Sequence, residues 1–199
     1  MKKLTVLLVT LAVVAMTSFA WAVPLATYTH NYGSGVGQFD PEGNDVLSNG
    51  FVTVSDQSSV RFSDSFNFNS VSYSSINHFD LTLTFSNTNG AFLNPELWFA
   101  RPGGTPDQYT SFKLNNAGNG TYTQSFVVDY RLVPEFNQMV NSKNFFFWFA
   151  EDTWFADNFR LYSASLDIDG TPVPEPGTIM LLGAGLLGLA VFGKRRMNK

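Results

Sequence analysis

The sequence predicts an all-β fold: an antiparallel β-sandwich or jelly-roll-like domain with an N-terminal signal peptide and a C-terminal single transmembrane helix. Three observations predict it. Aromatic residues make up 16% of the 199 residues and charged residues only 14%. This composition favours strands and differs from that of a cytosolic helical enzyme. Short runs that alternate apolar and polar residues recur through the middle of the chain, between turns rich in Gly, Pro and Asn. Each end carries an apolar run beside basic residues.

The strands are predicted from period-two alternation. In the run from Phe79 to Ser86, every second residue is Phe or Leu, and the run ends at the turn residues 87–90. The same alternation predicts strands at Tyr122–Val128 and Tyr162–Ile168. Shorter candidate strands are Gly50–Val54, Val60–Phe68, Glu96–Ala100, Tyr109–Leu114 and Asn144–Ala150.

Turn signals separate these strands at Gly33–Gly37, Pro41–Asn44, Arg101–Pro106 and Glu151–Asp157, and one helical turn is expected near Pro134–Val140. The chain therefore divides into five parts. They are a signal peptide (1–22), the β-sandwich domain (23–170), a Pro-rich linker (171–177), a transmembrane helix (178–193) and a basic cytoplasmic tail (194–199).

The N-terminus has the layout of a secretory signal. Lys2 and Lys3 precede an apolar run from Leu4 to Ala15, and small residues at Ala20 and Ala22 form a cleavage site. We expect the secretion translocon and signal peptidase as partners, with cleavage after Ala22. The alternative, an uncleaved anchor helix, is disfavoured because the apolar run is short for a membrane span.

The C-terminus combines a rigid segment, an apolar helix and a basic cluster. Alternating prolines, including Pro174 and Pro176 around Glu175, fix φ and disfavour helix in the residue before each. The apolar stretch that follows contains eight large aliphatic or Phe residues, worth about −2 to −5 kcal/mol toward insertion, but it is glycine-rich and short. Lys194, Arg195 and Arg196 then form a basic stop-transfer cluster that the positive-inside rule keeps in the cytoplasm.

This order of Pro174-Glu175-Pro176, glycine-rich apolar helix and terminal basic cluster resembles the PEP-CTERM sorting signal. The resemblance covers about the last 27 residues. It implies recognition at the tripeptide by an exosortase, an integral membrane enzyme of Gram-negative bacteria that make exopolysaccharide, and removal of the downstream helix. The alternative is a plain type I membrane anchor behind a proline linker.

Charge and cysteine content exclude several classes. Residues 23–170 carry 15 of the 16 acidic residues but only 6 of the 12 basic ones, a net charge of about −9. Nucleic acid is therefore not expected as a partner, since phosphate binding needs a basic surface. The chain has no Cys, which excludes disulfides, thiol nucleophiles and thiolate metal sites.

Candidate catalytic and metal residues each have a plainer interpretation. Asp167-Ile168-Asp169-Gly170 begins like a calcium loop but lacks the later ligands, so we predict a turn ending the last strand. His30 and His78 lie 48 residues apart, too weak a pattern for a metal pair. Asp40, Glu42 and Asp45 could supply calcium ligands, but loop carboxylates are usually just solvated. His78 and Asp80 could belong to a Ser-His-Asp triad, but no Gly-x-Ser-x-Gly elbow supports one. Glu151, Asp152 and Asp157 could form a glycosidase pair, but we prefer a turn between two strands. No catalytic residue, metal or cofactor is predicted, and the protein is expected not to be an enzyme.

Aromatic residues suggest a second role. Trp98, Trp148 and Trp154 are candidate carbohydrate contacts, although core packing is the commoner use of such side chains. Thr82-x-Thr84 and Thr121-x-Thr123 place hydroxyls on one strand face, a spacing that ice-binding surfaces use, but two pairs are too few and solvent-facing Thr is ordinary in strands. The predicted function is an exported, exosortase-processed protein with a structural or interaction role, at the inner membrane before processing and then at the cell surface or in the exopolysaccharide matrix. The alternatives are a carbohydrate-binding β-sandwich, with exopolysaccharide as its partner, and, last, a secreted hydrolase.

Overall fold

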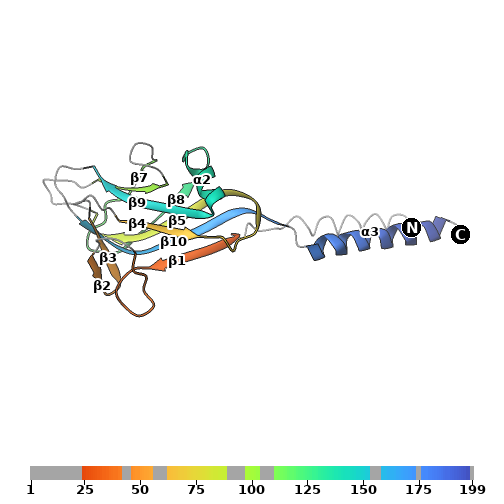
Figure 1. Cartoon of the computed structure of the whole chain (residues 1–199), viewed down its shortest axis with the longest axis horizontal. Coiled ribbons are helices and arrows are strands. Elements are labelled where there is room, and N and C mark those ends of the chain that lie inside the picture. Colours follow the sequence, from red (N-terminus) through yellow and green to blue (C-terminus); the bar gives the residue numbers. More distant parts are fainter. Residues whose placement is uncertain are drawn as a thin grey trace.

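A computed structural model describes residues 24–41, 46–55, 62–88, 97–103, 110–152, 158–173 and 176–197. In these ranges the chain forms two antiparallel sheets packed into a sandwich, with one long helix extending away from it (Figure 1). The predicted signal peptide, with Ala20 and Ala22, lies outside the described residues.

The larger sheet has six strands and is built around the long strand β10. Its path runs β2-β3-β10-β5-β8, and β1 also pairs with β10. On one side, β3 pairs with the first part of β10 and β1 with the part after it, while β5 lines the other side. The strands are β1 (Ala26–Asn31), β2 (Val46–Ser48), β3 (Phe51–Ser55), β5 (Tyr73–Ser86), β8 (Tyr122–Val128) and β10 (Asn158–Pro172).

The smaller sheet has four strands in the order β4-β9-β6-β7. They are β4 (Ser63–Asn67), β6 (Trp98–Pro102), β7 (Phe112–Lys113) and β9 (Asn144–Glu151). The short helix α2 (Phe136–Ser142) precedes β9 and buries Phe136 and Met139. Lys143 ends this helix in the left-handed conformation (φ 52°), and its N–H bonds to helical carbonyls.

The core between the sheets is mainly aromatic. Phe79 on β5 is fully buried, with its ring centroid 5.1 Å from Phe145 and 5.4 Å from Phe136. Phe159 on β10 meets Trp98 at 4.7 Å and Phe149 at 5.0 Å. Such tilted and edge-on contacts are the favoured geometry of aromatic pairs. Aromatic packing therefore stabilises this domain, whereas many other small exported domains are stabilised by disulfides.

The predicted alternation is confirmed where it was clearest. Phe79, Leu81, Leu83 and Phe85 are all fully buried, and the intervening residues face outward. The strands β8 and β9 and the helix α2 also form within a few residues of their predicted positions.

Three parts of the fold differ from the prediction. The sequence analysis did not propose β1 or β2, whose apolar residues are too few to alternate visibly. The last strand begins at Asn158 and runs to Pro172, so Asp167–Gly170 continues β10 instead of forming a turn. Arg101 and Pro102 belong to β6 and Glu151 to β9, because cross-strand pairing extends both strands into the predicted turns.

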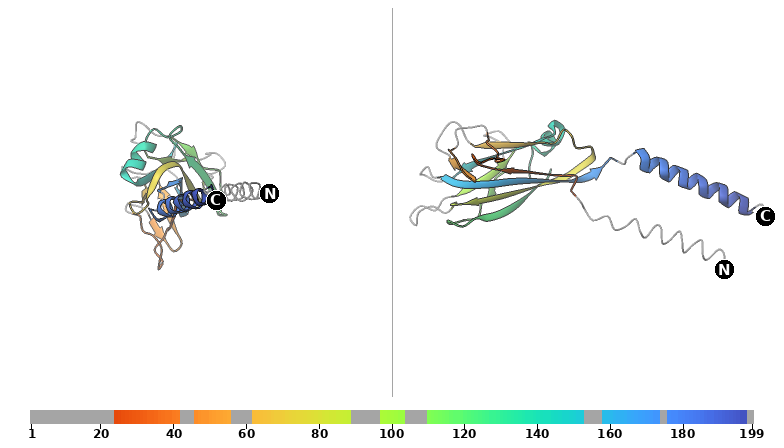
Figure 2. Two further views of the ribbon diagram at one scale, coloured as in Figure 1. Left: turned by 90° about the vertical axis from the view of Figure 1, so that its right-hand side faces the viewer. Right: turned by 90° about the horizontal axis from the view of Figure 1, so that it is seen from below.

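Helix α3 (Pro176–Met197) follows the sandwich and leaves it at the end where β10 stops (Figure 2). The predicted apolar segment 178–193 is therefore helical. Within the part of the chain that the structure describes, no helix reaches the length and hydropathy required to cross a membrane. The transmembrane assignment is accordingly not confirmed.

Candidate functional site

The sorting tail begins at the end of the last strand. β10 remains paired with β5 up to Pro172, opposite Tyr73, and α3 starts at Pro176. Pro172 has no N–H to donate, which suits it to the last position of a ladder. Val173 is half exposed, whereas Pro174 and Glu175 lie outside the described residues. The tripeptide thus begins two residues after the end of strand β10.

The helix that follows is not packed on the sandwich. Four of its leucines are more than half exposed, with Leu187 at 70% and Leu189 at 69%. Lys194 is exposed in the last part of α3, and the backbone of Arg195 and Arg196 belongs to its final turn. The apolar helix and basic cluster therefore have the order that the sequence predicts, on an element separate from the core.

Two of the candidate carbohydrate contacts are buried, which corrects their interpretation as binding residues. Trp98 is 1% exposed and packs edge-on against Phe159 inside the core. Trp148 is 7% exposed, donates Nε1–H to the carbonyl of Gly103 at 3.0 Å, and lies under the Arg101 guanidinium at 5.0 Å. Neither ring offers a free face on which a sugar could stack. Trp154 lies outside the described residues.

A buried carboxylate joins the two sheets at one open side of the sandwich. Asp64 on β4 has only 4% of its side chain exposed. Its Oδ2 accepts from Tyr32 at 2.5 Å and pairs with Nδ1 of His30 at 2.7 Å, and its Oδ1 accepts from the backbone N–H of Ser65 at 2.7 Å. The His30 ring stacks between Phe39, at 3.9 Å, and Phe66, at 4.4 Å.

This arrangement stabilises the fold at an edge. β4 is an edge strand, and the unpaired N–H groups of an edge strand are a template for pairing with other chains. Asp64 caps one of them and ties β4 to β1 at the same time. Burial, and then the charge of Asp64 and the hydrogen bond to it, raise the pKa of Tyr32 well above its ordinary value near 10.

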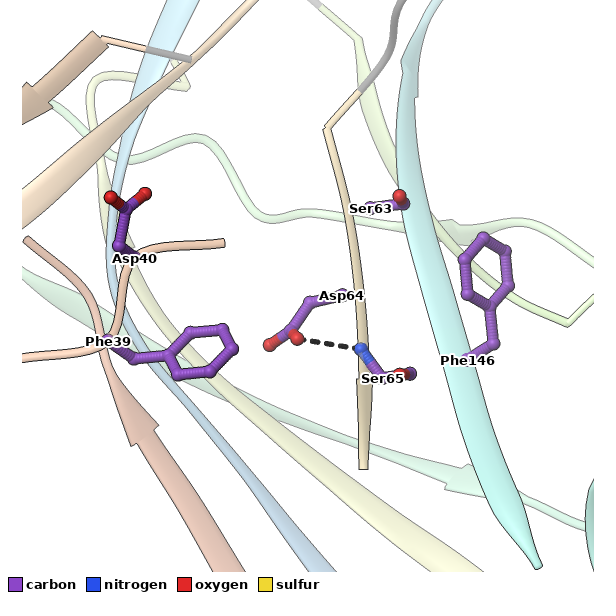
Figure 3. A pocket seen from close by; sticks show the side chains of 6 residues that line it. All are labelled: Phe39, Asp40, Ser63, Asp64, Ser65 and Phe146. Atoms are coloured by element: carbon purple, nitrogen blue, oxygen red, sulfur yellow. Dashed lines mark hydrogen bonds between the residues drawn. The ribbon is translucent and has the colours of Figure 1, made fainter. Parts of the chain in front are cut away.

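A pocket of about 360 Å³ lies beside Asp64 (Figure 3). Asp40, Ser63 and Ser65 supply polar groups to its wall, and Phe39 and Phe146 supply apolar ones. The Asp64 carboxylate is already engaged by three donors, so the polar groups left to a small ligand are chiefly those of the other three residues. Asp40 was a candidate calcium ligand, but Glu42 and Asp45 lie outside the described residues.

His78 lies on the outer face of the six-stranded sheet, whereas His30 is on its inner side. Both ring nitrogens of His78 face carboxylates: Nε2 lies 3.3 Å from Asp80 and Nδ1 lies 3.7 Å from Asp169. A triad base would need one nitrogen facing a nucleophile and the other facing the acid, so this geometry does not build the Ser-His-Asp arrangement.

The geometry of the described residues does not support the candidate metal ligands or the candidate glycosidase residues. Over the described ranges, no grouping of three or more His, Asp or Glu side chains is suited to a metal ion. Glu151 ends β9 opposite Trp98, and Asp152 follows it with its N–H bonded to the Leu97 carbonyl. Asp157 lies outside the described residues.

The outer face of the larger sheet carries rows of hydroxyl groups, a feature that the sequence analysis saw only in part. One row crosses four strands, and two hydrogen bonds lie within it: Thr29 to Ser165 at 3.0 Å and Thr82 to Ser125 at 2.8 Å. In the next row, Thr84 bonds Thr123 at 3.1 Å. Thr82 and Thr84 were noticed in the sequence, but their partners on other strands depend on register. The first row consists of Thr29, Ser165, Thr82 and Ser125; the second consists of Ser163, Thr84 and Thr123, with the amide of Asn31 beside Ser163.

The chain thus belongs to the class of folded domains that carry a C-terminal tail, here an unpacked apolar helix with a basic end. Residues 172–196 match the PEP-CTERM protein-sorting motif. The chain therefore carries this motif, which confirms the resemblance seen in the sequence. It indicates export, transient membrane anchoring and an exosortase as the processing partner.

The remaining comparisons add no functional information. A search of curated proteins finds no significant match. Among solved structures, the chain is similar to the coat protein of Tobacco streak virus, at 16% identity, over 65% of this chain and 91% of that one. The TM-score of 0.25 is too low for this likeness to bear on fold or function.

Proposed function

We propose that this protein is an exosortase substrate whose β-sandwich acts, without catalysis of its own, as a structural or interaction module at the cell surface or in the exopolysaccharide matrix. The carrying observation is the position of the sorting motif. It starts at Pro172, where the folded domain ends, so cleavage within the motif would release the whole sandwich and little else. Before processing, the apolar helix would hold the precursor at the inner membrane, and the signal peptide would have been removed after Ala22.

The test is the release of the domain by an exosortase. In a host with the enzyme, Glu175→Ala should leave export and membrane association intact, because Glu175 precedes the apolar stretch. It should stop maturation and trap a longer, membrane-bound form, since a charged group between two rigid prolines is suited to pairing with a basic pocket. Pulse-chase electrophoresis and fractionation would measure both.

A control is Thr121→Ala, which changes an exposed residue outside both the sorting motif and the end of β10. It should mature at the wild-type rate. Equal release of the wild-type and Glu175→Ala proteins would reject the sorting proposal and favour the plain type I anchor.

The second candidate function is carbohydrate binding, and the outer face of the larger sheet favours it. Its hydroxyl rows present groups that both donate and accept hydrogen bonds, at the regular spacing of neighbouring strands. The surface that we propose for sugar binding is therefore this sheet face and not Trp98 or Trp148. A glycan array would test it: binding that Thr29→Val and Thr82→Val together abolish would support this role, and binding that they leave unchanged would exclude this face.

A further inference from the structure

We propose that the last four residues of β10, Asp169–Pro172, must separate from β5 before the exosortase can process the tail. This inference rests on the proposed function. It makes the end of the sandwich a determinant of how fast the precursor matures, alongside the sorting motif itself.

The first ground is the length of free chain. Only the three residues 173–175 lie between the last paired residue, Pro172, and the first helical residue, Pro176. Fully extended, three residues span about 10 Å. An enzyme that grips the backbone around the tripeptide would collide with the end of the sheet. Releasing Asp169–Pro172 lengthens the free segment to seven residues, or about 23–25 Å.

The second ground is that this end of β10 is held more weakly than the rest. Along Ser163–Ile168, β10 pairs with β1 on one side and β5 on the other. Beyond Ile168, β5 is the one strand that pairs with β10 among the described residues, and the register shifts twice, between Asp169 and Gly170 and between Thr171 and Pro172. Thr171 and Pro172 are exposed. One-sided, irregular and exposed pairing is the kind that opens first in a folded protein.

The third ground concerns which strand moves. The beginning of β5 is anchored: Tyr73 donates its hydroxyl to the Val140 carbonyl at 2.9 Å, and its ring lies 5.3 Å from Nζ of Lys143. That Nζ in turn bonds the Val71 carbonyl at 3.3 Å. Opening at this end therefore releases β10 and leaves β5 attached to the end of α2.

A cross-strand disulfide tests the proposal directly. Ser75 and Thr171 are opposite each other and both exposed, and the chain has no Cys, so the double variant Ser75→Cys/Thr171→Cys has one disulfide to form. We expect the oxidised precursor to mature at least about tenfold more slowly than wild type, because processing follows the population of the open form. Reduction should restore the rate. Thiol labelling verifies the disulfide.

The matched control locks the same two strands at the far end. Thr84 and Ser163 are also opposite each other, so Thr84→Cys/Ser163→Cys adds a disulfide in a region that stays paired in either case. It should mature normally. A six-residue Gly-Ser spacer between Pro172 and Val173 should speed maturation by about tenfold, and should rescue the Ser75/Thr171 lock, because the spacer supplies the missing free chain.

The outcomes separate the two proposals. If Glu175→Ala matures like wild type, the sorting function itself fails. If Glu175→Ala is blocked but the verified Ser75/Thr171 disulfide leaves maturation at the wild-type rate, only strand release is overturned. A spacer that neither speeds maturation nor rescues the lock also overturns it.

Discussion

The sandwich and the tail of this chain are specified in different ways. The sandwich is specified by packing: its large aromatic residues are buried against one another from strands far apart in the sequence. The tail is specified by the order of its residues: four of its leucines are more than half exposed, and α3 extends away from the domain (Figure 2). Packing tolerates change only within the volume of a core, whereas a linear signal depends on the identity and order of a few residues.

This difference explains why the tail yields a partner and the sandwich does not. A processing enzyme reads residues in sequence order, so the motif can be recognised in one chain. A β-sandwich is an architecture shared by proteins of unrelated function, and its ligands depend on surface sites that each member builds separately. The predictions below probe the division between the two regions, from the largest expected effect to the smallest.

Phe79→Ala should give the largest loss of stability. Phe79 is fully buried, with ring centroids of Phe68, Phe136 and Phe145 within 5.6 Å. Removing a buried ring costs about 3–5 kcal/mol, measured by urea unfolding of the secreted domain. Val127→Ala is the control, because Val127 is 49% exposed on a neighbouring strand, and its effect should stay within about 0.5 kcal/mol. Equal effects would contradict the assignment of the core.

Tyr32→Phe should have an intermediate effect that depends on pH. At neutral pH it removes the hydrogen bond to Asp64 and should cost about 1 kcal/mol. The raised pKa of Tyr32 means that the folded state holds its proton more tightly than the unfolded state. The contribution of this raised pKa to the free energy of unfolding is complete below the pKa of Tyr in the unfolded chain, near 10, and is lost as the pH rises above that value.

The wild-type advantage over Tyr32→Phe should therefore shrink when unfolding is repeated above about pH 10. Tyr130→Phe serves as the control, since Tyr130 is 61% exposed, and it should follow the wild type at both pH values. A wild-type advantage that grows with pH would contradict the burial of Tyr32 beside Asp64.

Truncation after Val173 should have the smallest effect on stability. All the strands lie before this point, and the exposed leucines of α3 make no core. The free energy of unfolding should stay within about 0.5 kcal/mol of that of the unprocessed precursor, with a circular dichroism spectrum dominated by strand. Loss of cooperative unfolding would show that the tail belongs to the fold.

The sequence predicted the parts of the fold that depend on local periodicity. Phe79, Leu81, Leu83 and Phe85 alternate regularly, so β5 was found, as was the β-sandwich class. β1 was missed because its inner residues include His30, which becomes a core neighbour only through stacking on Phe39 and Phe66. No local sequence pattern predicts this stacking of His30 on the two Phe rings.

The candidate sites also divide into those that depend on adjacent residues and those that depend on strand pairing. The motif around Pro174 could be recognised because its parts are adjacent in sequence. The hydroxyl rows could not, because Thr82 and Ser125 are 43 residues apart and meet only through strand register. Trp98 and Trp148 were misjudged because an aromatic residue in a strand gives no indication of whether its face is covered until the second sheet is placed.

The pairing of β1 with β10 has a practical consequence for anyone who builds with this protein. Ala26 lies opposite Ile168, so the chain enters and leaves the sandwich at the same pole. A reporter fused ahead of β1 would crowd the tail. The turn at Gly118–Gly120 precedes Tyr122, which pairs with Phe85 at the opposite pole, and a side chain added at either glycine would meet open space. A peptide inserted at this turn would therefore lie at the opposite end of the sandwich from the tail, where it would be exposed without contacting the tail.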